Sequence, residues 1–215
     1  MGTDNIVTAP FRLAFPAVFV PKAAVQGGKE KYSILMLFPK DGSVLLPAEG
    51  TSASEAILAI RKLARDAIVE KWGADKAKWP SNLRNLNLKE HLSTNGKDGW
   101  PLVDGDCADF EGAAGHVLVR AKSLYKPGLV NGACQPIINQ EEVFGGLICR
   151  AQVNAFAYDS AGNKGVSLGL NNLQVLHDDG TSFSGRQAAA DVFDAFAAPG
   201  APAAASTGDI DDDFA

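Results

Sequence analysis

The chain has 215 residues, of which 46% are hydrophobic and 21% charged, enough for one domain with a buried core. The net charge is −5, but four of the carboxylates lie in the last seven residues, so residues 1–208 carry only −1 and can hold a local basic surface. The three cysteines form no C-x-x-C pair, which argues against a disulfide scaffold and favours a reducing cytoplasm. The three histidines are too scattered to suggest a metal cluster. No apolar run approaches eighteen residues, so a membrane span is not indicated.

The first forty residues predict two strands and contain an excess of basic side chains. Residues 11–20 alternate in hydrophobicity, and Pro16 on one face indicates an edge strand or a bulge. The other face would hold Leu13, Phe15, Ala17 and Phe19. A glycine turn leads to a second strand at 31–38. The charged residues of this region are Arg12, Lys22, Lys29, Lys31 and Lys40 against Asp4 and Glu30, a net charge of +3.

The middle of the chain predicts one long helix and an irregular segment. Ser52 and Glu55 form a capping-box pattern, Gly73 is a stop signal, and apolar residues recur between them at helical spacing. A short helix is expected around 81–91, and residues 100–115 resemble a turn-rich loop. This loop contains Asp104, Asp106 and Asp109, whose carboxylates could hold Mg²⁺ or Ca²⁺, although the spacing fails the EF-hand pattern and favours a polar turn.

The second half predicts three more strands, at 117–122, 146–158 and 164–176, with a hairpin turn between the last two. A short helix is expected near 186–196. About five strands with an α-helix inserted mid-chain fit a mainly β fold, a Greek-key five-stranded barrel of the OB type. The expected domain covers residues 1–197, and residues 198–215 form a flexible linker with a disordered acidic C-terminal tail.

The strand at 146–158 has two chemically different faces. Its odd positions are apolar or small and belong in a core. Its even positions are Arg150, Gln152, Asn154, Phe156 and Tyr158. Aromatic side chains beside a cation on an exposed face suit single-stranded nucleic acid, whose bases stack on aromatic rings while arginine contacts phosphate. The alternative is that the two aromatics pack under the long helix or at a dimer contact.

Further candidate contacts follow the neighbouring strands. Arg120 and Lys122 share one face of their strand, Tyr125 and Lys126 follow it, and Lys164 begins the next strand. Cations at these positions predict a path for a phosphate backbone. Trp100 lies beside turn residues and could either stack on bases or fill the core.

The segment from Gly165 to Gly169 fits the G-x-S-x-G pattern of a hydrolase nucleophile elbow. That elbow needs a strand, a sharp turn at the serine and then a helix, whereas here the motif lies inside an alternating strand. Ser167 is therefore interpreted as a strand residue between two close-packing glycines.

The C-terminal tail is the feature that most clearly predicts protein partners. Residues 198–208 lack large apolar side chains and should form a tether. The acidic peptide that follows consists of Asp209, Ile210, Asp211, Asp212, Asp213 and Phe214, before Ala215. Acidic termini are often only solubilising, but a phenylalanine does not serve that role, so the pattern favours a peptide gripped by partners. Such a tail can also compete with nucleic acid for a basic face.

Several segments, taken in order, resemble a family of phage-encoded single-stranded-DNA-binding proteins similar to the T7-type protein. They are residues 14–19, 32–40, 100–106, 121–128, 153–158, 162–166 and 169–173. The resemblance implies an OB-fold, no catalytic activity, a role in phage replication and recombination, an acidic tail that contacts replication proteins such as the polymerase and helicase, and a body able to form a homodimer. The T7-type tail ends on phenylalanine, whereas here Phe214 is penultimate.

The sequence thus predicts a cytoplasmic, non-enzymatic protein that binds single-stranded DNA without cofactor or metal. Bases would stack on Phe156 and Tyr158, with cations along the backbone path. Two other classes stay open: a recombination adaptor without DNA affinity, and a metal-dependent nucleic-acid enzyme that uses the carboxylates of the 100–115 loop.

Overall fold

The computed structural model describes residues 4–23, 27–47, 50–110, 112–160 and 162–183, and these form a mainly β fold. The strands are β1 (Ile6–Val7), β2 (Phe11–Ala23), β3 (Glu30–Pro39), β4 (Leu102–Asp104), β5 (His116–Ser123), β6 (Gly128–Val130), β7 (Ile148–Ser160) and β8 (Asn163–His177). The helices are α1 (Ala53–Trp72) and the short α2 (Ser81–Arg84), with single 3-10 turns at Lys76–Lys78, Gly105–Cys107 and Gln140–Glu142. The expected helix near 186–196, the domain boundary after 197 and the acidic tail lie outside the described residues.

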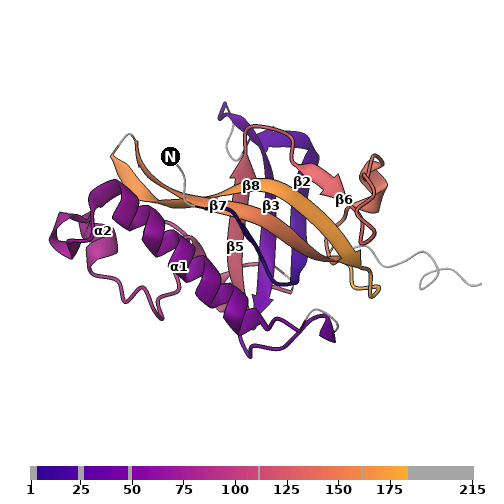
Figure 1. Ribbon diagram of the computed structural model, residues 1–215, viewed down its shortest axis with the longest axis horizontal. Coiled ribbons are helices and arrows are strands. Elements are labelled where there is room, and N and C mark those ends of the chain that lie inside the picture. Colours follow the sequence, from indigo (N-terminus) through magenta and orange to yellow (C-terminus); the bar gives the residue numbers. More distant parts are fainter. Residues whose placement is uncertain (1–3, 24–26, 48–49, 111, 161, 184–215) are drawn as a thin grey trace, which may run out of the picture. The chain divides into compact units, whose positions relative to one another are not determined.

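Five long strands close into a barrel (Figure 1). Strand β2 pairs with β3, β3 with β5, β5 with β8, β8 with β7, and β7 pairs back with β2. The β5–β8 pair is parallel and the others are antiparallel. This ring is the predicted OB-type Greek-key barrel, with α1 inserted in the chain between β3 and β5.

The five long strands agree with the predicted ones to within a few residues, whereas the shorter elements do not. Strands β1, β4 and β6 were not predicted, because two or three residues are too few to show alternation. The helix expected around 81–91 is confined to Ser81–Arg84. The residues after it form turns, from which Leu86, Leu88 and Leu92 pack against the main core.

Helix α1 begins at the predicted capping box. The Glu55 backbone N–H donates to Ser52 Oγ at 3.2 Å, and the Ser52 N–H donates to a Glu55 carboxylate oxygen at 2.8 Å. The buried stripe of the helix packs onto the barrel and consists of Ala53, Ala56, Ile60, Leu63, Ala64, Ala67 and Ile68. In Figure 1 the helix runs diagonally beside the strands, with α2 near its C-terminal end. Its opposite face is left exposed.

Apolar clusters lie on both faces of β5, one inside the barrel and one outside it. The inward side chains of β5, Val117, Val119 and Ala121, belong to the main core. On the outside, Leu35, Leu37 and Leu118 form a second, smaller cluster with residues of the segment that precedes β5. This cluster covers one end of the outer face of β3 and β5 and leaves the other end open.

Trp100 fills the core rather than the surface. Its side chain is only 2% exposed and belongs to the main cluster with Leu102 and Leu83. The indole N–H has no hydrogen-bond partner among the described residues. Of the two roles considered for this residue, the structure therefore supports core packing.

The G-x-S-x-G segment lies within β8, as the strand interpretation requires. Gly165 permits a close backbone crossing: the Val166 N–H donates to the Gly99 carbonyl at 2.8 Å, and a Cβ on Gly165 would lie 2.6 Å from Gly99 Cα. Gly169 gives the same kind of room to Asn154. Both glycines therefore serve packing rather than a nucleophile elbow.

Replacing Gly165 with alanine should lower the free energy of unfolding by about 1–3 kcal/mol, because the new methyl group overlaps backbone that cannot rotate away. Urea unfolding followed by circular dichroism measures the change. Gly132→Ala is the matched control, since its Cβ would meet the nearest atom at an ordinary 3.7 Å. Equal losses for the two variants would contradict this account of the crossing.

Candidate nucleic-acid interface

The open part of the outer face lies at the C-terminal end of β5. Leu118, Arg120 and Lys122 point to the same side, and their Cα partners on β3 are Leu37, Leu35 and Ser33. Leu118 is covered by the second cluster, whereas Arg120 is exposed and Lys122 is half-buried. Two predicted site residues therefore lie together where the apolar cover ends.

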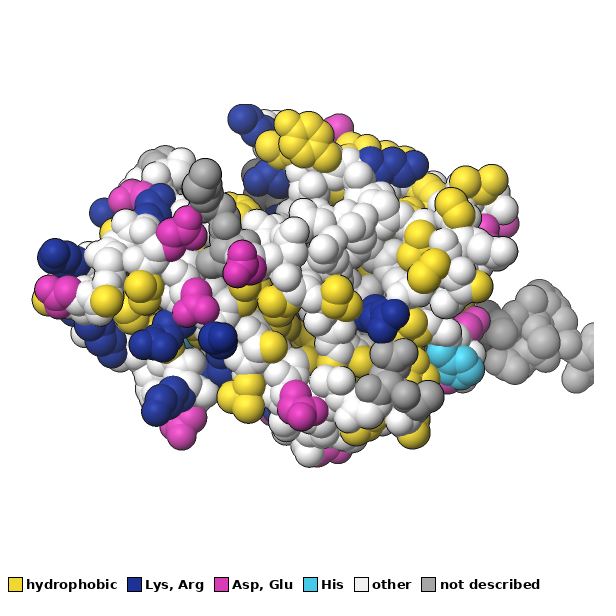
Figure 2. Space-filling view, viewed as in Figure 1, with side chains coloured by type: hydrophobic (Ala, Val, Ile, Leu, Met, Phe, Trp, Pro, Cys, Tyr) yellow, Lys and Arg dark blue, Asp and Glu magenta, His cyan; other side chains and the backbone are white. Residues whose placement is uncertain are grey.

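The β2–β3 hairpin adds three lysines to this pair. Lys22, Lys29 and Lys31 are exposed, and together with Arg120 and Lys122 they line a cavity of about 770 Å³. Figure 2 shows Lys or Arg side chains beside hydrophobic ones along the upper edge of the molecule, where the hairpin lies in Figure 1.

These cations repel one another and are not neutralised within the described part of the chain. Lys22 stands directly opposite Lys31 in the β2–β3 register, a placement that destabilises a sheet. Desolvation first, and then the charges of Arg120 and Lys31, lower the pKa of Lys122. Desolvation also lowers the pKa of Arg120. No described carboxylate forms an ion pair with any of these residues.

A second cavity, of about 410 Å³, borders the first, because Arg120 and Lys122 line both. Its other walls come from the segment before β5 and from the β7–β8 hairpin, including Phe110, Tyr158 and Ser167. The cavity therefore brings an aromatic ring of the last hairpin next to the cations of β5.

A third cavity, of about 910 Å³, continues beyond Tyr158 and shares this residue and Gly96 with the second. Its cations come from the region of α2, from the loop before β4 and from β8, namely Lys78, Arg84, Lys97 and Lys164. Lys164 is paired with Asp159 at 3.0 Å. We call the three connected cavities the basic groove. Its described lining contains no aspartate or glutamate.

Phe15 lies at the wall of the groove in a strained conformation. It has φ of 46°, is 50% exposed, and its ring meets Phe110 edge-on at 5.0 Å. The predicted bulge is present as a register shift between Ala14 and Ala17. The prediction that Phe15 lies on one face with Leu13 is wrong, because Leu13 is buried while the bulge turns the Phe15 side chain outward. Strained residues of this kind gather at functional sites.

The remaining predicted residues of β7 share its outer face but divide into two groups. Phe156 is 42% exposed and lies opposite Ser167, next to Tyr158 and on its side of the strand. Asn154 follows, opposite Gly169. Farther along, Arg150 and Gln152 line a separate hollow near β6. Their partners there are on β8: Arg150 Nε donates to Gln174 Oε1 at 2.7 Å, and Asn172 Nδ2 donates to Gln152 Oε1 at 2.6 Å.

Tyr125 and Lys126 lie in the turn after β5 and outside the lining of the groove. Tyr125 is 82% exposed, the largest exposure among the exposed apolar side chains of the described residues. The Lys126 ammonium lies 5.1 Å from the centre of the Phe19 ring, a cation–π distance.

Sequence reasoning missed most of the basic residues that complete the groove. Those from the hairpin are Lys22, Lys29 and Lys31, and those from the third cavity include Lys78, Arg84 and Lys97. The excess of positive charge in the first forty residues could have predicted that the lysines of the hairpin belong to the groove. The residues from the third cavity carry no periodic signal, because they come from an irregular segment.

The acidic loop considered as a metal site is occupied by a lysine. The Lys40 ammonium contacts Asp104 and also Asp106, the latter at 2.6 Å. The Gly115 backbone N–H and, to a smaller extent, Lys40 lower the pKa of Asp106. Asp109 is exposed, and it forms no ion pair with a described cation. This arrangement is that of the polar turn preferred from the sequence.

Comparison with known proteins identifies relatives for nearly the whole chain. The model of a family described as "Enterobacter phage Enc34, ssDNA-binding protein" matches residues 4–204. "Putative protein p50" of Acyrthosiphon pisum secondary endosymbiont phage 1 is 27% identical over 186 residues, 85% of this chain and 89% of its own. In the described residues, no helix combines the length and apolar character needed to cross a membrane.

One solved structure is similar in fold, and a second is a weaker match. The single-stranded DNA-binding protein from bacteriophage Enc34, solved in complex with ssDNA, has a TM-score of 0.57 at 20% identity, over 81% of this chain and 87% of that one. The gp2.5 single-stranded DNA-binding protein of bacteriophage T7 has a TM-score of 0.44 at 12% identity, over 87% and 91%.

Proposed function

The chain belongs to the family of the Enterobacter phage Enc34 ssDNA-binding protein, and from this membership we propose that it binds single-stranded DNA without sequence specificity. The family is one of binding proteins rather than enzymes, in line with the prediction of a non-enzymatic protein. The proposed function needs no cofactor or metal.

The observation that carries the proposal is a basic groove whose described lining contains many cations and no acidic residue, although Lys164 pairs with Asp159 outside the lining. Repulsion between like charges raises the free energy of the protein without ligand. It acts between the opposed Lys22 and Lys31 and between the neighbouring Arg120 and Lys122. A polyanion removes that repulsion when it binds. In an OB-fold, the face of the second and third strands, together with two hairpin loops, is where oligonucleotides bind. Here those strands are β3 and β5.

We assign the base contacts to aromatic rings at the groove and the phosphate contacts to its cations. Tyr158 and Phe15 line the groove, and Phe156 lies beside Tyr158 on the outer face of β7. Any base can stack on these rings, so sequence preference is weak. The phosphate backbone of the DNA is assigned to the cations of the groove, namely Lys22, Lys29, Lys31, Arg120, Lys122 and Lys164. Flanking contacts are assigned to the predicted residues that lie on adjoining surface outside the groove lining. These are Asn154, Gln152, Arg150, Tyr125 and Lys126.

The biological setting that we propose is phage DNA replication and recombination in the host cytoplasm. The acidic tail, residues 209–215, would recruit replication proteins through Ile210, Phe214 and its carboxylates. Family membership supports the setting, and the composition of the tail supports its role.

The test is an anisotropy titration of the full chain with a labelled oligo-dT of about thirty nucleotides and with the matching duplex, at two salt concentrations. We expect strong preference for the single strand and an affinity that falls steeply with salt, because phosphate contacts release counterions. The titration is repeated without residues 209–215, so that a blocking tail is recognised. Absence of binding by both forms would contradict the proposal and favour the adaptor function.

A further inference from the structure

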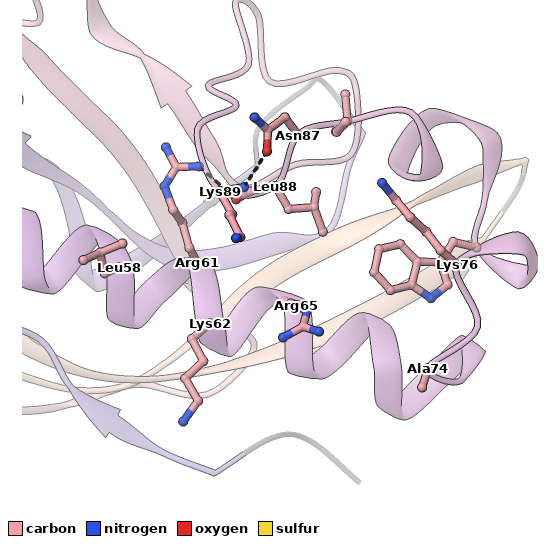
Figure 3. A pocket seen from close by; sticks show the side chains of 11 residues that line it. Leu58, Arg61, Lys62, Arg65, Ala74, Lys76, Asn87, Leu88 and Lys89 are labelled. Atoms are coloured by element: carbon pink, nitrogen blue, oxygen red, sulfur yellow. Dashed lines mark hydrogen bonds between the residues drawn. The ribbon is translucent and has the colours of Figure 1, made fainter.

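A second basic surface lies on the face of α1 opposite its buried stripe. Leu58, Arg61, Lys62 and Arg65 follow one another at helical spacing on this face. Together with residues between 74 and 89 they line a cavity of about 820 Å³, which we call the helix pocket (Figure 3). Cavities of this size enclose drug-sized ligands, which corresponds to a peptide segment of a few residues.

The rim of the helix pocket is basic. Its exposed cations are Lys62, Arg65, Lys76 and Lys89, and none of them forms an ion pair with a described carboxylate. Figure 3 shows these cations on both walls, Lys62 and Arg65 on the helix and Lys76 and Lys89 on the segment that faces it. The described lining contains no aspartate or glutamate, and acidic residues of the same segments, such as Asp66 and Glu90, lie outside it. The charge of the pocket therefore favours an anionic ligand.

Hydrogen bonds hold the walls of the pocket in place. Arg61 joins the helix to the facing segment, because its guanidinium donates to the carbonyl oxygens of Leu88 at 3.1 Å and His91 at 2.9 Å. At the end of the helix, Trp79 Nε1 donates to the Gly73 carbonyl oxygen at 2.9 Å. The pocket is thus formed before a ligand binds, which lowers the conformational entropy that binding costs.

The floor of the pocket is aliphatic, which distinguishes it from the basic groove. It consists of Leu58, Ala74, Leu86 and Leu88 around Trp79. Leu58 is 62% exposed, whereas Trp79 is only 6% exposed and offers no free ring face on which a base could stack. Aliphatic surface beside cations suits a peptide that carries both apolar side chains and carboxylates.

We propose that the helix pocket binds an acidic peptide segment of another protein, one in which aliphatic side chains are interspersed with carboxylates. The aliphatic side chains would cover the floor, and the carboxylates would meet the rim. The pocket shares Trp79 with the third cavity of the basic groove, but none of its cations line that groove. Peptide and single-stranded DNA can therefore be bound at the same time, and the inference does not depend on DNA binding.

The test is an anisotropy titration of the full chain with the labelled synthetic peptide DDLLDDLLDD at ~0.15 M salt. The matched control peptide, DDSSDDSSDD, has the same charge but no apolar side chain. We expect the leucine peptide to bind about tenfold more tightly, because its side chains leave water when they cover the floor. Equal affinities would show general charge attraction, and absence of binding would show that no docking site exists. Either result would overturn the proposal.

Two exposed residues of the pocket test where the peptide binds. Arg65→Glu reverses a rim charge and Leu58→Ser removes part of the floor, and each should weaken binding of the leucine peptide about fivefold. Thermal unfolding checks that both variants remain folded, as expected for exposed side chains. Lys31→Glu is the matched control, because Lys31 is an exposed cation of the basic groove. Equal losses with Lys31→Glu and Arg65→Glu would contradict the assignment to the pocket.

Saturating oligo-dT distinguishes a peptide site from an extension of the DNA path. We expect the leucine peptide to stay bound with unchanged affinity, because the two ligands contact different cations. Displacement of the peptide by oligo-dT would assign the helix pocket to nucleic acid and overturn the proposal.

Discussion

Replacing both Arg120 and Lys122 with alanine is expected to weaken the binding of oligo-dT about 25-fold at ~0.1 M salt. Each lost phosphate contact removes about 0.7 from the slope of the logarithm of the binding constant against the logarithm of salt. Loss of two contacts therefore lowers the slope by about 1.4. Anisotropy titrations at four or more salt concentrations measure both quantities.

The same double variant should remain folded. Lys122 is crowded by Arg120 and Lys31, so removal of charge here relieves repulsion. Thermal unfolding at low salt should accordingly show no loss of stability. Lys62→Ala serves as the control, because Lys62 is exposed on α1 and lies outside the groove lining. A double variant with an unchanged salt slope would remove β5 from the proposed DNA path.

The second large effect concerns the aromatic rings of β7. Tyr158→Ala and Phe156→Ala should each weaken binding by about 1–3 kcal/mol, which is about 5- to 150-fold, because a base loses its stacking surface. The salt slope should stay constant, since no phosphate contact is removed. This combination distinguishes stacking from the charge effect expected on β5.

Phe144→Ala is the matched control for these variants. Phe144 is 38% exposed, close to the 42% of Phe156, but it lies in the segment before β7, outside the groove lining and not on the strand that carries Tyr158. Equal affinity losses for Phe144→Ala and Phe156→Ala would point to a general effect of truncation. A folded protein that lacks both β7 rings and binds normally would rule out the stacking site.

The two basic surfaces of the body differ in chemistry, and this difference separates the two proposals. The basic groove places aromatic rings beside an almost continuous row of cations, which suits a chain of bases and phosphates. The helix pocket places aliphatic side chains inside a ring of cations, which suits an acidic peptide with apolar anchors. Failure of the peptide titration would leave the DNA-binding proposal intact, and the converse also holds.

The local features of this protein could be predicted from its sequence. The buried and exposed positions of β7 follow from alternation, because side chains of a strand point to opposite faces in turn. The ends of α1 follow from a capping box and a glycine, which satisfy the backbone groups that a helix leaves free. The acidic tail could be recognised from composition alone.

The site itself depended on tertiary structure. Lys31, Lys122 and Tyr158 are far apart in the chain, and only closure of the barrel brings them to one groove. The outward turn of Phe15 results from a bulge whose direction alternation does not encode. Alternation and capping are properties of neighbouring residues, whereas a groove is a property of strands that meet through long-range pairing, and the pairing is decided by how the whole barrel closes.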